Sequence, residues 1–175
     1  MLALIVEKGY EHVSVQDILD RADVGRSTFY AHYRDKEELL LGGFDESFAA
    51  FVEATGAAND DERVRFLEPA LVLFQHADGH RHVWKALVGK QSSEVVLRYL
   101  REHLAGVISQ HLRQQIDDHV PDELVFAATV QYTVNALIGV LAWWSETDAP
   151  YTPDELHRLF VRLSSTGIQR SLTVA

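Results

Sequence analysis

The chain contains no cysteine and only four prolines among its 175 residues. The lack of cysteine excludes disulfide bonds, thiolate metal sites, iron–sulfur ligands and a cysteine nucleophile. No continuous apolar run reaches the roughly 18 residues that a membrane-spanning helix needs. The apolar start leads directly into Glu7 and Lys8, without the basic region or cleavage site of a signal peptide. We therefore expect a cytoplasmic protein with no membrane partner.

Positive charge is also scarce. Lys and Arg number 16 against 26 Asp and Glu, which gives a formal net charge of −10. Over the whole chain this argues against a nucleic-acid coat or a membrane-surface protein, because both tend to be basic. Residues 21–36, however, carry a local net charge of +2. The sequence thus predicts weak non-specific DNA binding and a phosphate-binding surface confined to one small face.

Apolar side chains recur at helical spacing almost throughout, and no alternating run bounded by turns indicates a strand. We predict an all-α fold of about nine helices, over residues 1–8, 14–22, 26–32, 36–55, 62–77, 81–89, 93–117, 121–145 and 152–172. Small and polar residues 56–61 mark the clearest break. Residues 1–45 are expected to form one domain and residues 46–175 a second, with the fourth helix joining them.

The most informative pattern lies in residues 13–36. Two short helices separated by a tight turn at residues 23–25 form a helix-turn-helix unit. Its core is predicted to contain Ile18, Leu19, Ala22, Val24, Phe29 and Tyr33, packed on Leu2, Ile5 and Tyr10. The second helix of such a unit enters the DNA major groove. Here it offers hydrogen-bond donors to phosphates and base edges: Arg26, Ser27, Thr28, Tyr30 and His32.

The string Thr28-Phe29-Tyr30-x-His32-Tyr33-x-x-Lys36, preceded by Ser14-Val15-x-Asp17-Ile18, resembles the DNA-binding domain of the tetracycline-repressor (TetR/AcrR) family over about residues 2–45. The resemblance implies a homodimeric transcriptional regulator, usually a repressor released from a palindromic operator by a small-molecule effector. It places Gln16, Arg26 and Thr28 against bases, and Ser14, Ser27, Tyr30, His32 and Lys36 mostly against phosphates. Relatives have several more residues at the start, so the first helix is expected to be shortened here.

Residues 46–175 match that family only in helical layout, which implies a ligand-binding and dimerisation domain. Residues 124–144 are apolar on nearly every side, and such a helix must be buried on every side. In a domain this small, a second subunit is the expected cover, and an ordinary monomer core is the alternative. The predicted dimer interface contains Val134, Ile138, Leu141, Leu156, Phe160, Leu163 and Gly167.

Aromatic and polar side chains in this second region suggest a small-molecule pocket. The candidates for ligand binding are Phe74, Trp84, Tyr99, His103, Gln131 and Asn135. Core packing and hydrogen bonding between helices are the alternatives. His76, His80 and His82 lie close together with Asp78, but a helix break at Asp78-Gly79 leaves no fixed ligand face, so neither a metal nor a cofactor is expected.

No catalytic motif is present, and we expect the protein not to be an enzyme. Two other functions stay open at this point. One is an all-α carrier or sensor of an apolar small molecule that does not bind DNA. The other is a helical enzyme that depends on a metal or a cofactor.

Overall fold

The computed structural model describes residues 1–43, 67–89, 94–115, 122–147 and 150–173. Within these ranges the regular elements are helices, which confirms the predicted all-α class. Residues 1–43 form a small unit, called the head here, with α1 (Leu2–Lys8), the 3-10 helix η1 (Tyr10–His12), α2 (Val15–Ala22), α3 (Arg26–His32) and helical residues 36–43. The other helices form the body: α5 (Glu68–Gly79), α6 (Arg81–Val88), α7 (Glu94–Gln115), α8 (Glu123–Glu146) and α9 (Pro153–Thr173).

These helices begin and end within a few residues of the predicted bounds wherever the two can be compared. Three predictions fall outside the described residues: the end of the fourth helix, the break at residues 56–61, and the start of the next helix at residue 62. The proposed domain boundary at residues 45 and 46 also lies there. The two-domain division therefore stays a prediction.

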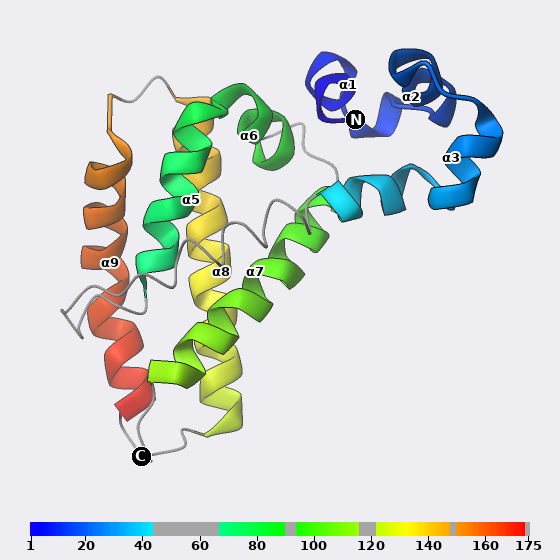
Figure 1. Ribbon diagram of the computed structural model, residues 1–175. Helices are drawn as coiled ribbons and strands as arrows, with labels where there is room; N and C mark the ends of the chain where they lie inside the picture. The colour runs from blue at the N-terminus through cyan, green and yellow to red at the C-terminus, as the bar shows by residue number, and fades with distance from the viewer. Residues whose placement is uncertain (44–66, 90–93, 116–121, 148–149, 174–175) are drawn as a thin grey trace.

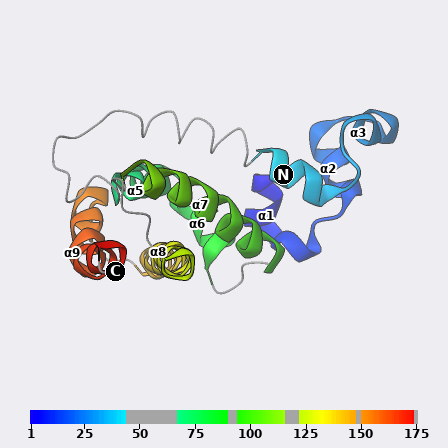
Figure 2. The same ribbon diagram turned by 90° about the horizontal axis from the view of Figure 1, so that it is seen from below.

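The head projects from one end of the body, and α3 lies farthest from the body in both views (Figures 1 and 2). In the body, α8 and α9 pack side by side as one layer, with α5 on α9 and both α6 and α7 on α8 (Figure 2). The head meets the body through α1, which contacts α6. A helix at the tip is free to meet a partner without obstruction from the body.

Caps and turns determine where the short helices of the head begin and end. Gly9 ends α1 with φ 77° and ψ 149°, a conformation essentially restricted to glycine. Ser14 and Asp17 form a reciprocal capping box at the start of α2. Asp23 ends α2 in the left-handed region at φ 53°, which Asp tolerates better than most residues. These local signals explain why three short helices form in this order.

The core of the head differs in part from the prediction. Its buried side chains are Leu4, Ile5, Tyr10, Val13, Ile18, Leu19, Phe29 and Leu40. Leu2, Ala22 and Val24 were expected inside, but all three are exposed. The reason is helical phase, because α1 turns Leu4 and Ile5 inward and leaves Leu2 and Val6 on the outside.

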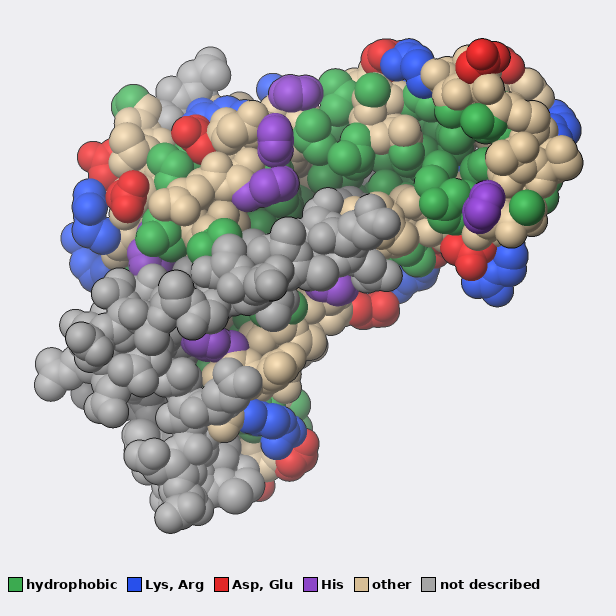
Figure 3. Space-filling model, in the orientation of Figure 1, with side chains coloured by type: hydrophobic (Ala, Val, Ile, Leu, Met, Phe, Trp, Pro, Cys, Tyr) green, Lys and Arg blue, Asp and Glu red, His purple; other side chains and the backbone are tan. Residues whose placement is uncertain are grey.

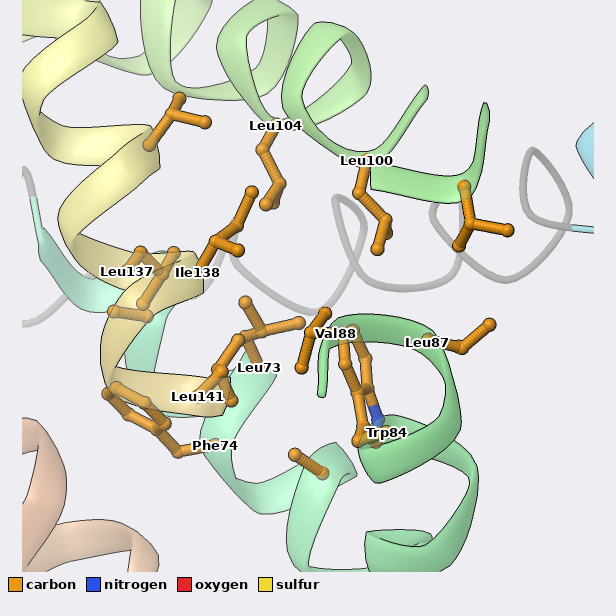
Figure 4. Close-up of a cluster of buried hydrophobic side chains, with 14 of the residues drawn as sticks. Leu73, Phe74, Trp84, Leu87, Val88, Leu100, Leu104, Leu137, Ile138 and Leu141 are labelled. Carbon is orange, nitrogen blue, oxygen red and sulfur yellow. The ribbon is translucent and has the colours of Figure 1, made fainter. Parts of the chain in front are cut away.

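The body is held by a continuous apolar core in which α8 is the central element (Figure 4). Phe74 is fully buried and makes edge-to-face contacts with Trp144 and Phe160, at ring-centroid distances of 6.3 and 6.1 Å. Such pairs are favourable beyond the apolar area that they bury. Two polar side chains inside this region have partners: His157 bonds the Leu67 carbonyl at 3.1 Å, and the Trp144 indole N–H donates to the Tyr151 carbonyl at 3.2 Å.

One helix, α8, is long and apolar enough to cross a membrane by length and composition alone. In the fold it is packed as a core helix, with 44% of its most apolar window buried inside the chain. Its remaining surface is open and largely apolar: Leu124, Tyr132 and Trp143 are 78%, 53% and 44% exposed, and the polar Gln131 and Asn135 lie among them. The chain by itself therefore covers only one side of this helix.

The predicted dimer interface requires correction for this reason. Five of its members are buried within the chain itself: Val134, Ile138, Leu141, Leu156 and Phe160. Side chains covered by their own chain cannot also contact a partner, so these residues belong to the core of the body. Leu163, which is 65% exposed, and Gly167 remain on the outside of α9. The hydrophobic pattern alone did not distinguish the inner side of α8 from the outer.

Candidate nucleic-acid interface

The side chains of α3 divide cleanly between the inside and the outside of the head. Phe29 is buried and contacts the ring of Tyr30 edge-on at 5.2 Å and the ring of Tyr33 at 5.8 Å. The five predicted DNA-binding side chains of this helix are all exposed: Arg26, Ser27, Thr28, Tyr30 and His32. One aromatic anchor thus holds α3 to the head, while its polar face at the tip of the molecule stays open to solvent.

Ser14 has a structural role at the start of α2. Its hydroxyl accepts a hydrogen bond from the Asp17 N–H at 3.2 Å and donates to the Asp17 carboxylate. Lys8 lies 2.7 Å from the same carboxylate, and the Lys8 and Ser14 hydrogen bonds together hold the pKa of Asp17 well below its usual range. The Ser14 side chain is therefore committed within the head, although it stays exposed beside the first turn of α2.

Lys36 was predicted to hold a phosphate, but its ammonium group points into the head. The Nζ atom donates to the carbonyl oxygens of Tyr10 and Val13, at 2.9 and 2.8 Å, and lies 4.3 Å from the centre of the Tyr10 ring. The phenol is buried against this contact, and burial, followed by nearby acids, raises the pKa of Tyr10 to about 12. Lys36 thus ties the fourth helix to η1, and one N–H of its ammonium group remains for another acceptor.

The other basic side chains of residues 21–36 are largely neutralised by neighbours. Arg21 pairs with Glu7 at 2.6 Å and Arg34 pairs with Glu38 at 3.2 Å. Arg26 instead donates from Nη2 to the amide oxygen of Gln16 at 2.6 Å. On the face of the head seen in Figure 3, acidic and basic side chains are interspersed. Within this fully described segment, Arg26 is the arginine whose guanidinium is bonded to a neutral side chain rather than to a carboxylate.

The six predicted ligand-binding residues do not converge on one site. Phe74 lies in the core, and Trp84 on α6 donates its indole N–H to Nδ1 of His76 at 3.1 Å. Gln131 and Asn135 are exposed on α8, and the Asn135 amide donates to the Gln131 carbonyl of the same helix at 2.8 Å. Both side chains therefore lie outside the core of the body.

Tyr99 and His103 lie together on α7, with ring centroids 5.8 Å apart, and both are half-buried. The Tyr99 hydroxyl donates to the Leu41 carbonyl in the head at 3.2 Å, and Arg98 lies 3.4 Å from Glu37. Together with the packing of α1 on α6, these bonds connect the head to the body. Sequence patterns do not predict these bonds, because nothing local relates α7 to residues 37–41.

Histidine side chains gather at the α5–α6 corner (Figure 3). The helix breaks at His80, close to the predicted Asp78-Gly79 position, and the rings of His76 and His80 lie 4.9 Å apart. Burial, followed by the neighbouring His80, lowers the pKa of His76. Among the described residues, no three histidine or acidic side chains are grouped as metal ligands.

Comparisons with known proteins agree with the arrangement of the head and body. A profile described as "Bacterial regulatory proteins, tetR family" matches residues 2–42, and one described as "Transcriptional regulator C-terminal region" matches residues 66–166. The chain belongs to the tetR family. This is a family of DNA-binding transcriptional regulators, and the resemblance seen in residues 2–45 is confirmed.

The individual relatives are distant. The uncharacterized HTH-type transcriptional regulator YxbF of Bacillus subtilis is 26% identical over 92% of this chain, and the chain spans 41% of that protein. The fatty acid metabolism regulator protein of Bacillus subtilis is 22% identical over 94% of this chain and 90% of that protein. A TetR transcriptional regulator from Streptococcus agalactiae has the same fold, with a TM-score of 0.70 and 23% identity over 94% of this chain and 88% of that one.

Proposed function

We propose that the protein is a homodimeric DNA-binding transcriptional regulator, in which the α3 helices of two subunits enter successive major grooves of a palindromic operator. The observation that carries this proposal is the α3 helix itself. It lies at the tip of the head, is anchored by buried Phe29, and exposes a continuous polar face. A short helix presented in this way fits the major groove, where its first residues reach the base edges.

The DNA contacts proposed from motif position are compatible with the geometry. Arg26 and Thr28 begin α3, where base contacts are expected, and Gln16 lies beside Arg26 on α2. Ser27, Tyr30 and His32 are exposed donors for phosphates on either side of the groove. Ser14 has no donor left, because its hydroxyl and its backbone N–H both donate to the Asp17 carboxylate, so it supports this surface only by shaping the start of α2. Lys36 contributes to phosphate binding through the one N–H left over from its bonds within the head.

The second subunit is proposed to cover the outer face of α8 together with the neighbouring part of α9. This face carries exposed Leu124, Tyr132 and Trp143 on α8 and exposed Leu163 on α9. The two helices lie side by side in one layer of the body (Figure 2). Gly139 and Gly167 leave open space above their backbones, so a partner helix can approach closely at either position. Large exposed apolar patches of this kind mark interaction sites.

A small-molecule effector is proposed to act through the joint between body and head. The joint consists of α6 against α1, and of α7 against residues 37–41. An effector that binds better to one arrangement of this joint changes the spacing of the two heads and lowers operator affinity. Repression that such an effector relieves, in the cytoplasm, is the mode of action that the family relationship favours.

Selection from a random double-stranded DNA pool tests the proposal. The full chain is expected to enrich a palindrome whose half-sites are about 10 base pairs apart from centre to centre. Tyr30→Phe keeps the ring that contacts Phe29 and removes only the hydroxyl, so it should weaken binding to enriched and unrelated duplexes alike. Failure to enrich any sequence at low salt, with the chain folded and dimeric, contradicts DNA recognition and favours a carrier or sensor that acts without DNA.

A further inference from the structure

A line of hydrogen bonds runs across the DNA-facing surface of the head, from α2 to α3. The Gln16 amide nitrogen donates to the Asp20 carboxylate at 2.7 Å, and the Gln16 amide oxygen accepts from Arg26 Nη2 at 2.6 Å. Residues 16 and 20 are one helical turn apart on α2, whereas Arg26 begins α3. All three side chains are exposed, so their order does not come from burial.

The chemistry of the two outer groups fixes the orientation of the Gln16 amide. A carboxylate only accepts hydrogen bonds and a guanidinium only donates them. An amide turned the other way would place its NH₂ group against Arg26 and its oxygen against Asp20, with both contacts repulsive. The orientation therefore follows from the neighbours. Asp20 fixes the orientation of the Gln16 amide, and the Gln16 amide oxygen in turn holds the guanidinium of Arg26 in position.

Gln16 is engaged at both ends by this arrangement. A glutamine that reads adenine uses both its oxygen and its nitrogen in a bidentate contact. One N–H and one oxygen lone pair of Gln16 are already used by Asp20 and Arg26, so a bidentate contact with adenine would have to share both ends of the amide with these partners. Arg26 is in the opposite situation, because one of its five N–H donors is used and the others remain for a ligand.

The distribution of charge also favours Arg26 over Gln16 as the residue that contacts a base. Arg21 and Arg34 are paired with carboxylates, and Lys36 is turned toward backbone carbonyls. The guanidinium of Arg26 keeps its full positive charge at the first residue of α3, and the first residues of a recognition helix are those that contact base edges. Arginine in bidentate contact with O6 and N7 of guanine is the commonest specific contact in the major groove.

We propose that Arg26 reads one guanine in each half-site, and that Gln16 and Asp20 are positioning residues that hold its guanidinium in place. This inference rests on the proposed DNA-binding function and refines it, because Gln16 acts on Arg26 rather than on a base. The ordering of a long arginine side chain is then largely complete before DNA arrives, which favours a single contact geometry. Asp20 itself lowers the affinity for DNA, since its carboxylate repels phosphates.

The test compares base preferences, measured by selection from a random double-stranded DNA pool and then by titration of single-base variants of the enriched duplex. Arg26→Ala and Arg26→Lys should each lower the preference for guanine at one position per half-site by about tenfold to a hundredfold. The lysine variant keeps the charge, so its loss of overall affinity should be smaller. Gln16→Ala should lower the preference at the same position several-fold, and should have no further effect on it when combined with Arg26→Ala.

Asp20→Asn separates positioning from charge. It should strengthen binding to unrelated DNA, because a negative charge is lost, yet weaken the guanine preference, because Gln16 is released. Asp23→Asn is the matched control: it removes the same charge from the neighbouring turn, and asparagine tolerates the left-handed backbone there. The control should strengthen unrelated binding and leave the guanine preference unchanged. A circular dichroism melt of each variant verifies the fold.

The outcomes distinguish this inference from the function on which it rests. If Gln16→Ala changes the preference at another position, Gln16 reads a base itself and the positioning role is overturned. If the wild-type chain enriches a palindrome whose guanine preference survives Arg26→Ala, only this inference fails. If the wild-type chain enriches nothing, the proposed function and this inference fail together.

Discussion

The head keeps its polar side chains outside on short helices, whereas the body buries large aromatic side chains between long ones. In the head, order comes largely from individual polar bonds: the capping box of α2 and the Lys36 ammonium on two carbonyls. In the body, order comes from a continuous apolar core centred on α8. The difference shows how one chain combines a reading surface whose groups stay exposed with a body whose open apolar face needs a partner.

Two adjacent tryptophans give the sharpest test of that difference, and the largest expected effect. Trp144 is fully buried against Phe74, whereas Trp143 is 44% exposed on the proposed dimer face. Trp144→Ala should lower the free energy of unfolding by about 3–5 kcal/mol, because it leaves a cavity in the core. The measurement is urea unfolding at several protein concentrations.

Trp143→Ala should instead weaken the dimer, so that its effect depends on protein concentration and appears in light scattering after size-exclusion chromatography. Equal, concentration-independent losses for both variants would mean that the outer face of α8 is not an interface.

The second prediction concerns the polar bonds that Lys36 makes in the head. Lys36→Met keeps most of the side-chain volume but removes the ammonium donor from the Val13 carbonyl and leaves the Tyr10 carbonyl with only the Val13 N–H. Such a loss costs about 1–3 kcal/mol, and we expect that destabilisation of the head in hydrogen exchange of α2 and α3. Arg34→Met is the matched control, since it removes an exposed ion pair with Glu38 that is worth about 1 kcal/mol or less. If the two variants behave alike, Lys36 has no special role in the head.

The third prediction compares two glycines of the body. A Cβ at Gly89 would overlap the carbonyl oxygen of Lys85 and lie 3.1 Å from a Glu146 carboxylate oxygen, so Gly89→Ala should destabilise by about 1–3 kcal/mol. Gly106→Ala meets open space within α7 and should stabilise by about 0.5–1 kcal/mol. Thermal unfolding of the pair checks both signs. A neutral Gly89→Ala would show that the end of α6 is looser than this packing implies.

The smallest expected effects are pH dependences, and they separate the two regions. In the head, the Lys8 and Ser14 bonds lower the pKa of Asp17, so their stabilisation is present above about pH 4 and is lost as the pH falls further. In the body, burial lowers the pKa of His76, so its stabilisation is present above about pH 6.5 and is lost below it.

The body should therefore weaken first on acidification, because a protonated His76 Nδ1 cannot accept the Trp84 N–H. Tryptophan fluorescence follows the body alone, since Trp84, Trp143 and Trp144 all lie there, and hydrogen exchange follows the head. His76→Gln should remove the dependence near pH 6, and Asp17→Asn the one below pH 4. If the head loses its hydrogen-exchange protection at a higher pH than the tryptophan fluorescence of the body changes, the assignment of the two pH dependences is wrong.

The same contrast explains what the sequence could predict. The head follows from local signals, since Gly9, the Ser14–Asp17 box and the spacing from Thr28 to Lys36 each act within a few residues. Its exposed α3 face was predicted, but the inward turn of Lys36 was not, because its carbonyl partners lie 23 and 26 residues away.

In the body, helix existence and bounds followed from periodicity, but an almost uniformly apolar α8 has no phase that distinguishes core from interface. Val134 and Leu141 are therefore predicted at the dimer interface although they are buried in the chain itself, whereas Tyr132, which is exposed on the same helix, is not. Which side of such a helix faces inward depends on the helices packed against it, and the local sequence of α8 does not predict that packing.

Hydroxyl-radical footprinting of the full chain on an enriched duplex tests the central claim most directly. The account predicts two protected segments related by a twofold axis, with centres one helical turn (about 34–36 Å) apart, and protection that Arg26→Ala reduces at both. A single protected segment, or protection of equal strength along unrelated DNA, would contradict a dimer that reads two half-sites with α3.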